Sequence, residues 1–208
     1  MRPTLWHLTH EKNISLIRSE QCLLPAATIV PGCAGTIRRG RDIRHGQPVL
    51  RDQDLLHATC VELTDGWRME DYLHDLASRV FFWSGWADRP VRPGRNAVQR
   101  YRDSDAIIRV PFADIATNHQ PYFSRCNSGA TRMQFGKRVP RGPSTFAVAA
   151  DCPYRPGAVV EVTFAGPVRL PASCEVARSL EGPWEPLLAS SNPSTSGRAK
   201  SARRSTKR

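Results

Sequence analysis

The sequence has no hydrophobic run approaching the roughly 20 apolar residues that a helix needs to span a bilayer. Its first residues also lack the charged segment followed by an apolar one that is typical of a secretory signal. The six cysteines show neither C-x-x-C spacing nor a histidine placed as in a zinc site. We therefore expect a cytoplasmic protein with reduced cysteines, no membrane association and no metal.

Acidic residues are scarce relative to basic ones. The 208-residue chain has 30 Lys and Arg against 19 Asp and Glu, a formal net charge of +11. Residues 198–208 hold six of the basic residues and no acid, so the remainder has 24 basic and 19 acidic residues, or +5. A body with this charge fits DNA, RNA or a phosphate-bearing cofactor as partner, and it equally fits an ordinary solvated surface.

The length and a hydrophobic content of 40% predict one globular domain, which we place at residues 1–178. From residue 190 the chain is dominated by Ser, Pro, Gly, Arg and Lys, which predicts a disordered basic tail over residues 190–208. Residues 32–48 are rich in Gly, Pro and Arg without a hydrophobic period, and this composition predicts an exposed loop.

Hydrophobic periodicity alternates between that of strands and that of helices along the chain. This pattern predicts an α+β fold, a split and mainly antiparallel sheet with short flanking helices. Asn13 is expected to cap the first helix. The expected strands are residues 5–9, 79–83, 106–111 and 159–164, and the expected helices are residues 13–20, 54–63, 68–77, 96–102 and 112–116.

Successive side chains of a strand face opposite ways, so His7 and Thr9 share one face of the first strand. The same alternation places Glu161 opposite the packed valines of its strand and presents it to solvent. Asn127 and Ser128 lie in a polar, turn-prone run, where they either bind a ligand or close a turn. Taken singly, each of these residues also fits a surface or turn position without a function.

Together, however, these segments resemble the ADP-ribosyltransferase superfamily. The resemblance rests on His7 with Thr9, the aromatic strand of residues 79–83, and the late strand bearing Glu161. It is nearest to the bacterial toxins that ADP-ribosylate DNA. Residues 4–175 are still more similar to a bacterial domain family of unknown function, through the runs at 50–53, 79–83, 127–131 and 141–146.

The resemblance implies an enzyme that consumes NAD as a substrate and transfers ADP-ribose to DNA or RNA. Such an enzyme would act as a toxin or defence effector, with an antitoxin protein as partner. The resemblance also implies a role for each candidate residue. Glu161 is expected to stabilise the transition state; Arg51 to bind the diphosphate or assist Glu161; His7 and Thr9 to bind the adenosine ribose; Phe82 or Trp83 to stack on nicotinamide; and Asn127 and Ser128 to contact the substrate.

The aromatic strand departs from the superfamily pattern, which usually offers a tyrosine or a serine there. Here the strand carries only Phe and Trp until Ser84. A non-catalytic nucleic-acid-binding module with a degenerate NAD site is therefore the alternative function. An RNA 2′-phosphotransferase is a third hypothesis, for which the sequence does not identify the phosphate-binding arginines.

Overall fold

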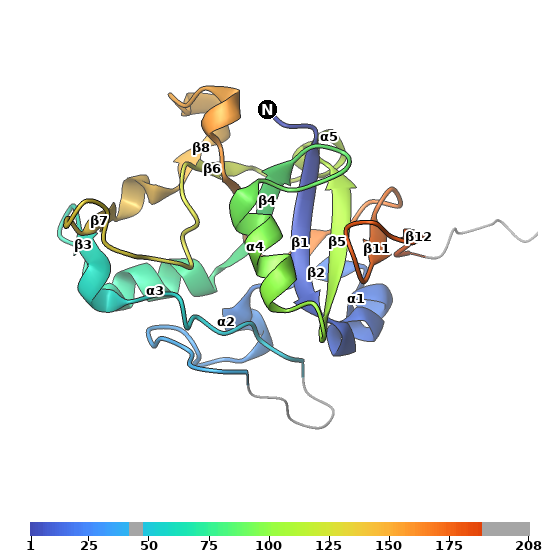
Figure 1. The fold of residues 1–208 in the computed structure, drawn as a ribbon, viewed down its shortest axis with the longest axis horizontal. Coiled ribbons are helices and arrows are strands. Elements are labelled where there is room, and N and C mark those ends of the chain that lie inside the picture. Colours follow the sequence, from blue (N-terminus) through green and yellow to red (C-terminus); the bar gives the residue numbers. More distant parts are fainter. Residues whose placement is uncertain (42–47, 189–208) are drawn as a thin grey trace, which may run out of the picture.

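The computed structural model describes residues 1–41 and 48–188, and it has an α+β architecture (Figure 1). The predicted tail at 190–208 lies outside the described residues, as does the part of the Arg-rich loop at 42–47. Within the described ranges no helix combines the length and the apolar character needed to cross a bilayer.

A large antiparallel sheet organises the fold, and small elements flank it. Its strands, from edge to edge, are β12 (Glu185–Pro186), β11 (Glu175–Ala177), β5 (Asp105–Pro111), β1 (Thr4–His10), β4 (Arg79–Gly85), β9 (Glu161–Ala165), β6 (Tyr122–Ser124) and β8 (Ala147–Val148). Two small sheets pair β2 (Cys22–Leu23) with β10 (Val168–Arg169) and β3 (Val61–Leu63) with β7 (Val139–Arg141). The helices are α1 (Ile14–Glu20), α2 (Ala26–Ile29), α3 (Met69–Ala77), α4 (Arg92–Arg100) and α5 (Phe112–Ala116).

The sheet splits between β1 and β4. β1 pairs with β5 along all its residues from Thr4 to His10, but with β4 only from Thr4 to Trp6. β4 instead continues alongside β9, down to Arg79. Beyond Trp6 the two central strands therefore separate, and their facing backbone and side chains are available to line a cavity.

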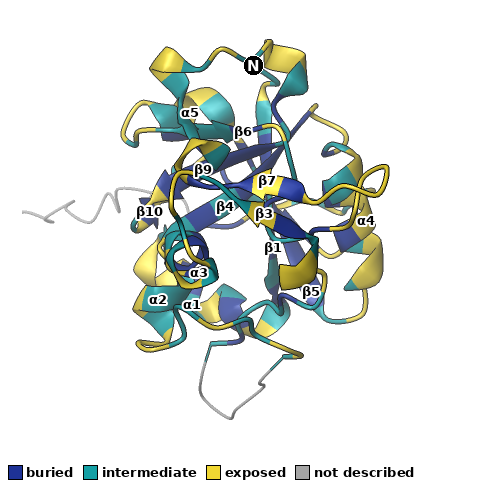
Figure 2. Cartoon of the chain, turned by 90° about the vertical axis from the view of Figure 1, so that its left-hand side faces the viewer, coloured by how far each residue is buried: buried dark blue, intermediate teal, exposed yellow. Residues whose placement is uncertain are grey.

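The two faces of the sheet are packed by different side chains, as the alternation in the first strand predicts. Trp6 packs with Trp83 and with Ala97 of α4 on one face, which α4 covers in Figure 1. Leu5 and Phe82 belong to the larger core on the other face. In Figure 2 the central strands are coloured mainly as buried, consistent with layers on both sides.

The helix predicted at residues 54–63 is absent. The chain there makes turns, a short 3-10 turn at Ala58–Cys60 and then β3. Leu56 is fully buried against Tyr72 of α3, and β3 pairs in parallel with β7. Burial and strand pairing outweigh the weak helical spacing of this segment, because tertiary contacts override local propensity.

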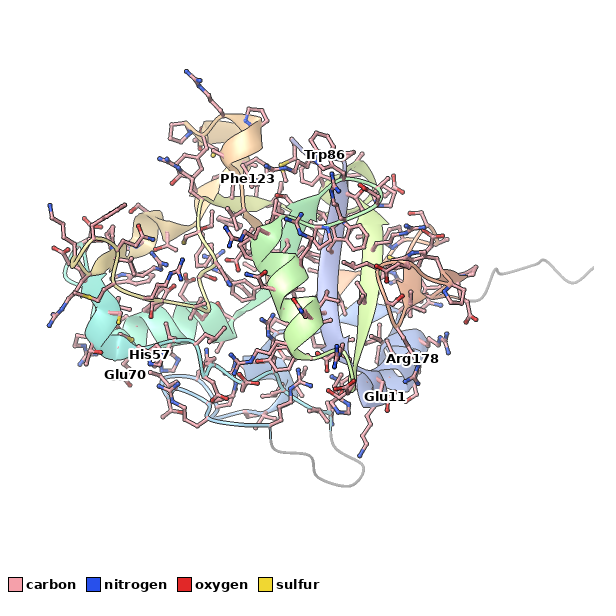
Figure 3. All side chains as sticks on the ribbon, viewed as in Figure 1. Glu11, His57, Glu70, Trp86, Phe123 and Arg178 are labelled. Atoms are coloured by element: carbon pink, nitrogen blue, oxygen red, sulfur yellow. The ribbon has the colours of Figure 1, made fainter. Side chains whose placement is uncertain are left out.

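Two further predictions need correction. The helix expected at 96–102 runs from Arg92 to Arg100, with a proline in its first turn, where the fixed φ of proline suits helix initiation. Asn13 makes no capping hydrogen bond with its side chain. It instead bonds to Thr9 and Val49, so it fastens a distant segment. At the same end of β1, Glu11 forms an ion pair with Arg178, and the two lie together in Figure 3.

Replacing Asn13 with alanine is expected to destabilise the fold by about 3 kcal/mol, because it leaves the buried N–H and C=O of Val49 without partners. The matched control is Asn96→Ala, at an exposed position within α4. The control should change stability by less than about 0.5 kcal/mol. Chemical denaturation of the three proteins measures the difference. Equal losses in the two variants would show that the Asn13 amide does not fasten Val49.

Candidate functional site

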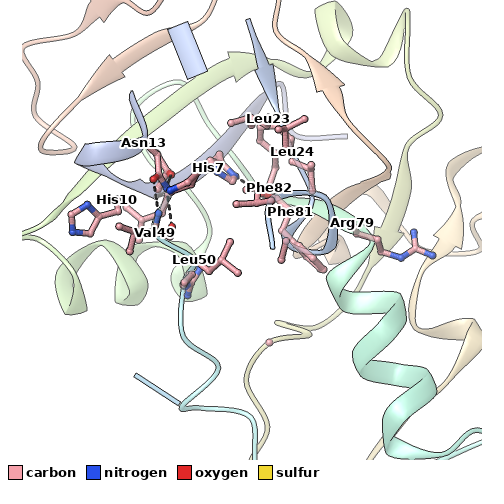
Figure 4. Close-up of a pocket in the computed structure, with 18 of the residues that line it drawn as sticks. His7, His10, Asn13, Leu23, Leu24, Val49, Leu50, Arg79, Phe81 and Phe82 are labelled. Carbon is pink, nitrogen blue, oxygen red and sulfur yellow. Dashed lines mark hydrogen bonds between the residues drawn. The ribbon is translucent and has the colours of Figure 1, made fainter. Parts of the chain in front are cut away.

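A cavity of about 210 Å³ lies where β1 and β4 separate (Figure 4). Its walls come from β1, α1, the segment 48–53, β4, the loop 127–129 and β9. All the site residues that the sequence predicts line this one cavity: His7, Thr9, Arg51, Phe82, Trp83, Asn127, Ser128 and Glu161. The structure therefore brings the predicted residues together, while the role of each stays a prediction.

His7 bridges the split in the sheet. Its Nδ1 donates to the carbonyl oxygen of Phe81 at 2.8 Å, a bond drawn in Figure 4. Burial lowers the pKa of His7 to about 4, although the Phe81 carbonyl opposes the shift. The imidazole is thus neutral at pH 7, with its proton on Nδ1 and Nε2 left as an acceptor. From the sequence, we expect His7 to offer a ligand both a donor and an acceptor. The donor, Nδ1–H, is already bonded to Phe81, so only the acceptor Nε2 remains for a ligand.

Glu161 is buried, at 3% exposure, so the prediction that it is presented to solvent is wrong. β6 covers the outer edge of β9, and the loop that follows β6 folds over the carboxyl group, where the backbone N–H of Ser128 donates to Oε2 at 2.9 Å. Burial raises the pKa of Glu161 to about 7, and the bonding from Ser128 and the charges of Arg51 and Arg141 limit the rise. The carboxyl group is therefore close to half ionised at neutral pH.

The strand register explains how residues from both faces of the sheet reach one cavity. Trp83 and Glu161 are cross-strand partners and so share a face, whereas Phe82 pairs with Val162 and faces the other way. His7 belongs to the Leu5 face of β1, and its ring lies 5.5 Å from that of Phe82. In an unbroken sheet the backbone would separate these two groups. The split removes that barrier.

Two polar atoms in this wall lack partners. Within residues 1–41 and 48–188, neither the indole Nε1 of Trp83 nor the hydroxyl of Ser128 has a hydrogen-bond partner, although both are buried. A buried polar group without a partner costs about 1–3 kcal/mol. Since both residues line the cavity, a polar ligand there would satisfy them.

Arg51 is held beside the cavity by aromatic rings. Its guanidinium carbon lies 4.9 Å from the ring centroid of Trp83 and 5.4 Å from that of Tyr101. The hydroxyl of Tyr101 donates to the neighbouring Asp52 carboxylate at 2.8 Å, which fixes this segment. In the described ranges no carboxylate is within ion-pair distance of Arg51. Its planar donor fork is thus suited to an anionic ligand.

Sequence reasoning missed Arg79, which also lines the cavity. Its guanidinium lies between the rings of Tyr122 and Phe146, 4.7 and 4.6 Å from their centroids, and pairs with Asp75 at 2.8 Å. The sequence did hold a signal for this residue. Arg79 and Trp83 are four positions apart in one strand, and side chains an even number of positions apart lie on the same face.

The comparisons with known proteins identify a family but no activity. The family model described as "Family of unknown function (DUF7002)" matches residues 3–174. No curated protein and no solved structure matches the chain.

The raised pKa of Glu161 predicts a pH-dependent stability difference between the wild type and Glu161→Gln. The folded protein holds the carboxyl proton up to about pH 7 and the unfolded chain only to about pH 4.5, so wild-type stability falls between these values. The variant has no such proton. Its stability relative to wild type should therefore rise by about 3 kcal/mol from pH 4.5 to pH 8.

Chemical denaturation across this pH range measures the effect, and the His7 contribution cancels because both proteins carry it. The matched control is Glu62→Gln on β3, an exposed position, for which the difference should stay flat. A flat difference for Glu161→Gln as well would contradict the raised pKa.

Proposed function

We propose that the chain, which belongs to the family of unknown function (DUF7002), is an NAD-dependent ADP-ribosyltransferase. The observation that carries the proposal is the convergence of His7, Arg51, Trp83 and Glu161 on one cavity in the split of the sheet. These residues come from four separate segments, and each supplies a chemistry that cleavage of NAD needs. The resemblance to the ADP-ribosyltransferase superfamily points to the same reaction.

In the proposed reaction the bond between the ribose C1′ and the nicotinamide nitrogen breaks, and its electron pair leaves with nicotinamide. Positive charge builds on the ribose, which an ionised Glu161 stabilises more in the transition state than in the bound substrate. An acceptor nucleophile then bonds to C1′, and its proton passes to the carboxylate. The low polarity around Glu161 strengthens this electrostatic effect.

The remaining residues bind the dinucleotide. The free Nε2 of His7 accepts from a ribose hydroxyl, with Thr9 beside it, and the fork of Arg51 binds the diphosphate. Of the two predicted stacking residues, Phe82 is packed edge-on against Phe164 in the core, whereas Trp83 has an unpartnered N–H beside the cavity. This contrast favours Trp83 as the nicotinamide contact.

We propose nucleic acid as the acceptor. The formal net charge of +11, of which residues 198–208 contribute six, fits a polyanionic acceptor. ADP-ribosylation of DNA or RNA would act as a toxin or defence activity, and an antitoxin protein is then the expected partner.

One observation favours the alternative, a non-catalytic nucleic-acid-binding module. Ser84, the first hydroxyl in the aromatic strand, is fully buried and donates to the carbonyl oxygen of Val159 at 2.6 Å. It therefore offers nothing to the cavity, where the superfamily usually has a serine or a tyrosine. A degenerate site would bind nucleic acid through basic side chains without cleaving NAD.

Glu161→Gln is expected to lower NAD cleavage and ADP-ribose transfer by about 100-fold or more, because an amide cannot neutralise the developing charge. The wild-type rate should rise as pH passes through about 7, since the reaction needs the ionised carboxylate. Release of nicotinamide from labelled NAD, with DNA, RNA or lysate as acceptor, measures both. Glu62→Gln, exposed on β3, is the matched control and should keep full activity.

Absence of NAD cleavage by the wild type would refute the enzyme, and undiminished transfer by Glu161→Gln would refute the catalytic role of Glu161. The alternative module is then identified by its own properties. It should bind nucleic acid with steep salt dependence, retain this binding in His7→Ala, and show no rise in melting temperature with NAD.

Arg51→Lys is expected to raise KM for NAD by about tenfold with a smaller change in kcat, because lysine keeps the charge but loses the bidentate fork. Arg92→Lys, at an exposed position in α4, is the control and should leave KM unchanged. An unchanged KM in Arg51→Lys would remove Arg51 from the diphosphate site.

A further inference from the structure

We infer that the exposed hairpin of residues 132–138, with Phe135 at its tip, is a docking element that holds an unpaired nucleic acid strand beside the cavity. The inference deepens the proposed function and rests on it, since it names the form of the acceptor and the surface that recognises it. The hairpin itself needs no NAD to bind, so its role can be tested apart from catalysis.

The hairpin ends in a tight two-residue turn. Gln134 and Lys137 exchange both backbone hydrogen bonds, each at 2.9 Å, and the turn residues Phe135 and Gly136 have φ of 50° and 72°. Asn or Gly normally precedes the glycine of such a turn, because a bulky residue at positive φ is strained. The Phe135 side chain has a relative exposure of 104%, so it makes no packing contact that offsets this strain. We therefore expect the ring of Phe135 to contact a binding partner, not another part of the chain.

Both ends of the hairpin are fixed to the body. The backbone N–H of Thr131 donates to the carbonyl oxygen of Leu55 at 2.8 Å, and Val139 begins β7, which pairs with β3. Gly129, six residues before Phe135, still lines the cavity, so the tip lies within about 20 Å of the cavity wall along the chain. In Figure 2 the segment leading into β7 is coloured as exposed.

The charges around the ring select a polyanion. Arg132, Lys137 and Arg138 flank the tip and are exposed, and residues 115–150 contain no Asp or Glu. Three exposed cations in seven residues favour a partner that carries several negative charges, such as the phosphates of a nucleic acid strand.

A single ring beside these cations fits an unpaired strand better than a duplex or a lipid surface. A lone aromatic side chain stacks on one unpaired base of any sequence, whereas the bases of a duplex are already stacked. A lipid surface would need a wider apolar face, and the only other large exposed hydrophobic in the hairpin is Met133. We therefore commit to single-stranded nucleic acid as the occupant.

Binding of a short fluorescein-labelled thymidine oligonucleotide, followed by fluorescence anisotropy, tests the inference. All proteins are full-length and carry Glu161→Gln, which prevents modification of the probe. Adding Phe135→Asn should weaken binding about tenfold and leave the melting temperature equal or higher, because asparagine suits the turn. Adding Trp86→Ala, which removes an exposed aromatic ring outside the hairpin, should leave affinity unchanged.

Three outcomes would overturn the docking role. These are unchanged affinity in Phe135→Asn, an equal loss in Trp86→Ala, and binding of the matching duplex or of polyglutamate as tight as that of the single strand. The proposed function fails separately, because nicotinamide release by the protein with Glu161 intact reports cleavage, whereas the anisotropy of the Glu161→Gln proteins reports binding alone. Cleavage without Phe135-dependent binding refutes only the hairpin, and Phe135-dependent binding without cleavage refutes only the enzyme.

Discussion

The separation of β1 from β4 after Trp6 is the constraint on which the rest of the site depends. At this point β4 loses a backbone partner on one side, and the Phe81 carbonyl is satisfied by the His7 side chain instead. Because unpaired backbone groups are costly when buried, this bond stabilises the split and at the same time fixes the imidazole. The cavity therefore forms because the pairing of β1 with β4 ends at Trp6.

Burial controls the chemistry of the two ionisable groups in this cavity. It keeps His7 neutral, and it holds the pKa of Glu161 at about 7 against the stabilising effect of Ser128 and nearby arginines. A carboxyl group kept in this environment lowers the stability of the fold at neutral pH, since its charge is poorly solvated. Shifts of this kind, caused by burial beside a specific charge, are characteristic of functional sites.

The segment carrying Arg51 has little regular structure, and polar contacts with three other parts of the chain hold it. Asn13 bonds both backbone groups of Val49, Tyr101 bonds Asp52, and the backbone N–H of Arg38 donates to the side chain of Gln53 at 3.0 Å. Arg41 pairs with Asp52 of this segment at 3.8 Å and is itself held by a bidentate pair with Asp105, the first residue of β5. These polar contacts take the place of a helix or a strand in positioning the guanidinium of Arg51.

The sequence by itself determined the α+β class, the helix α3, the strands β1, β4 and β5, and the alternation of side chains on β1, because period and composition are local properties. It also singled out the residues that meet in the cavity, through their resemblance to a known arrangement. Only the tertiary structure decided that Glu161 is buried, since that depends on β6 and the loop carrying Ser128, which are distant in sequence. The segment expected to be a helix at 54–63 instead ends in β3, which pairs with β7, and the Asn13 side chain bonds Val49 instead of capping a helix. In both cases long-range pairing and burial outweigh local preference.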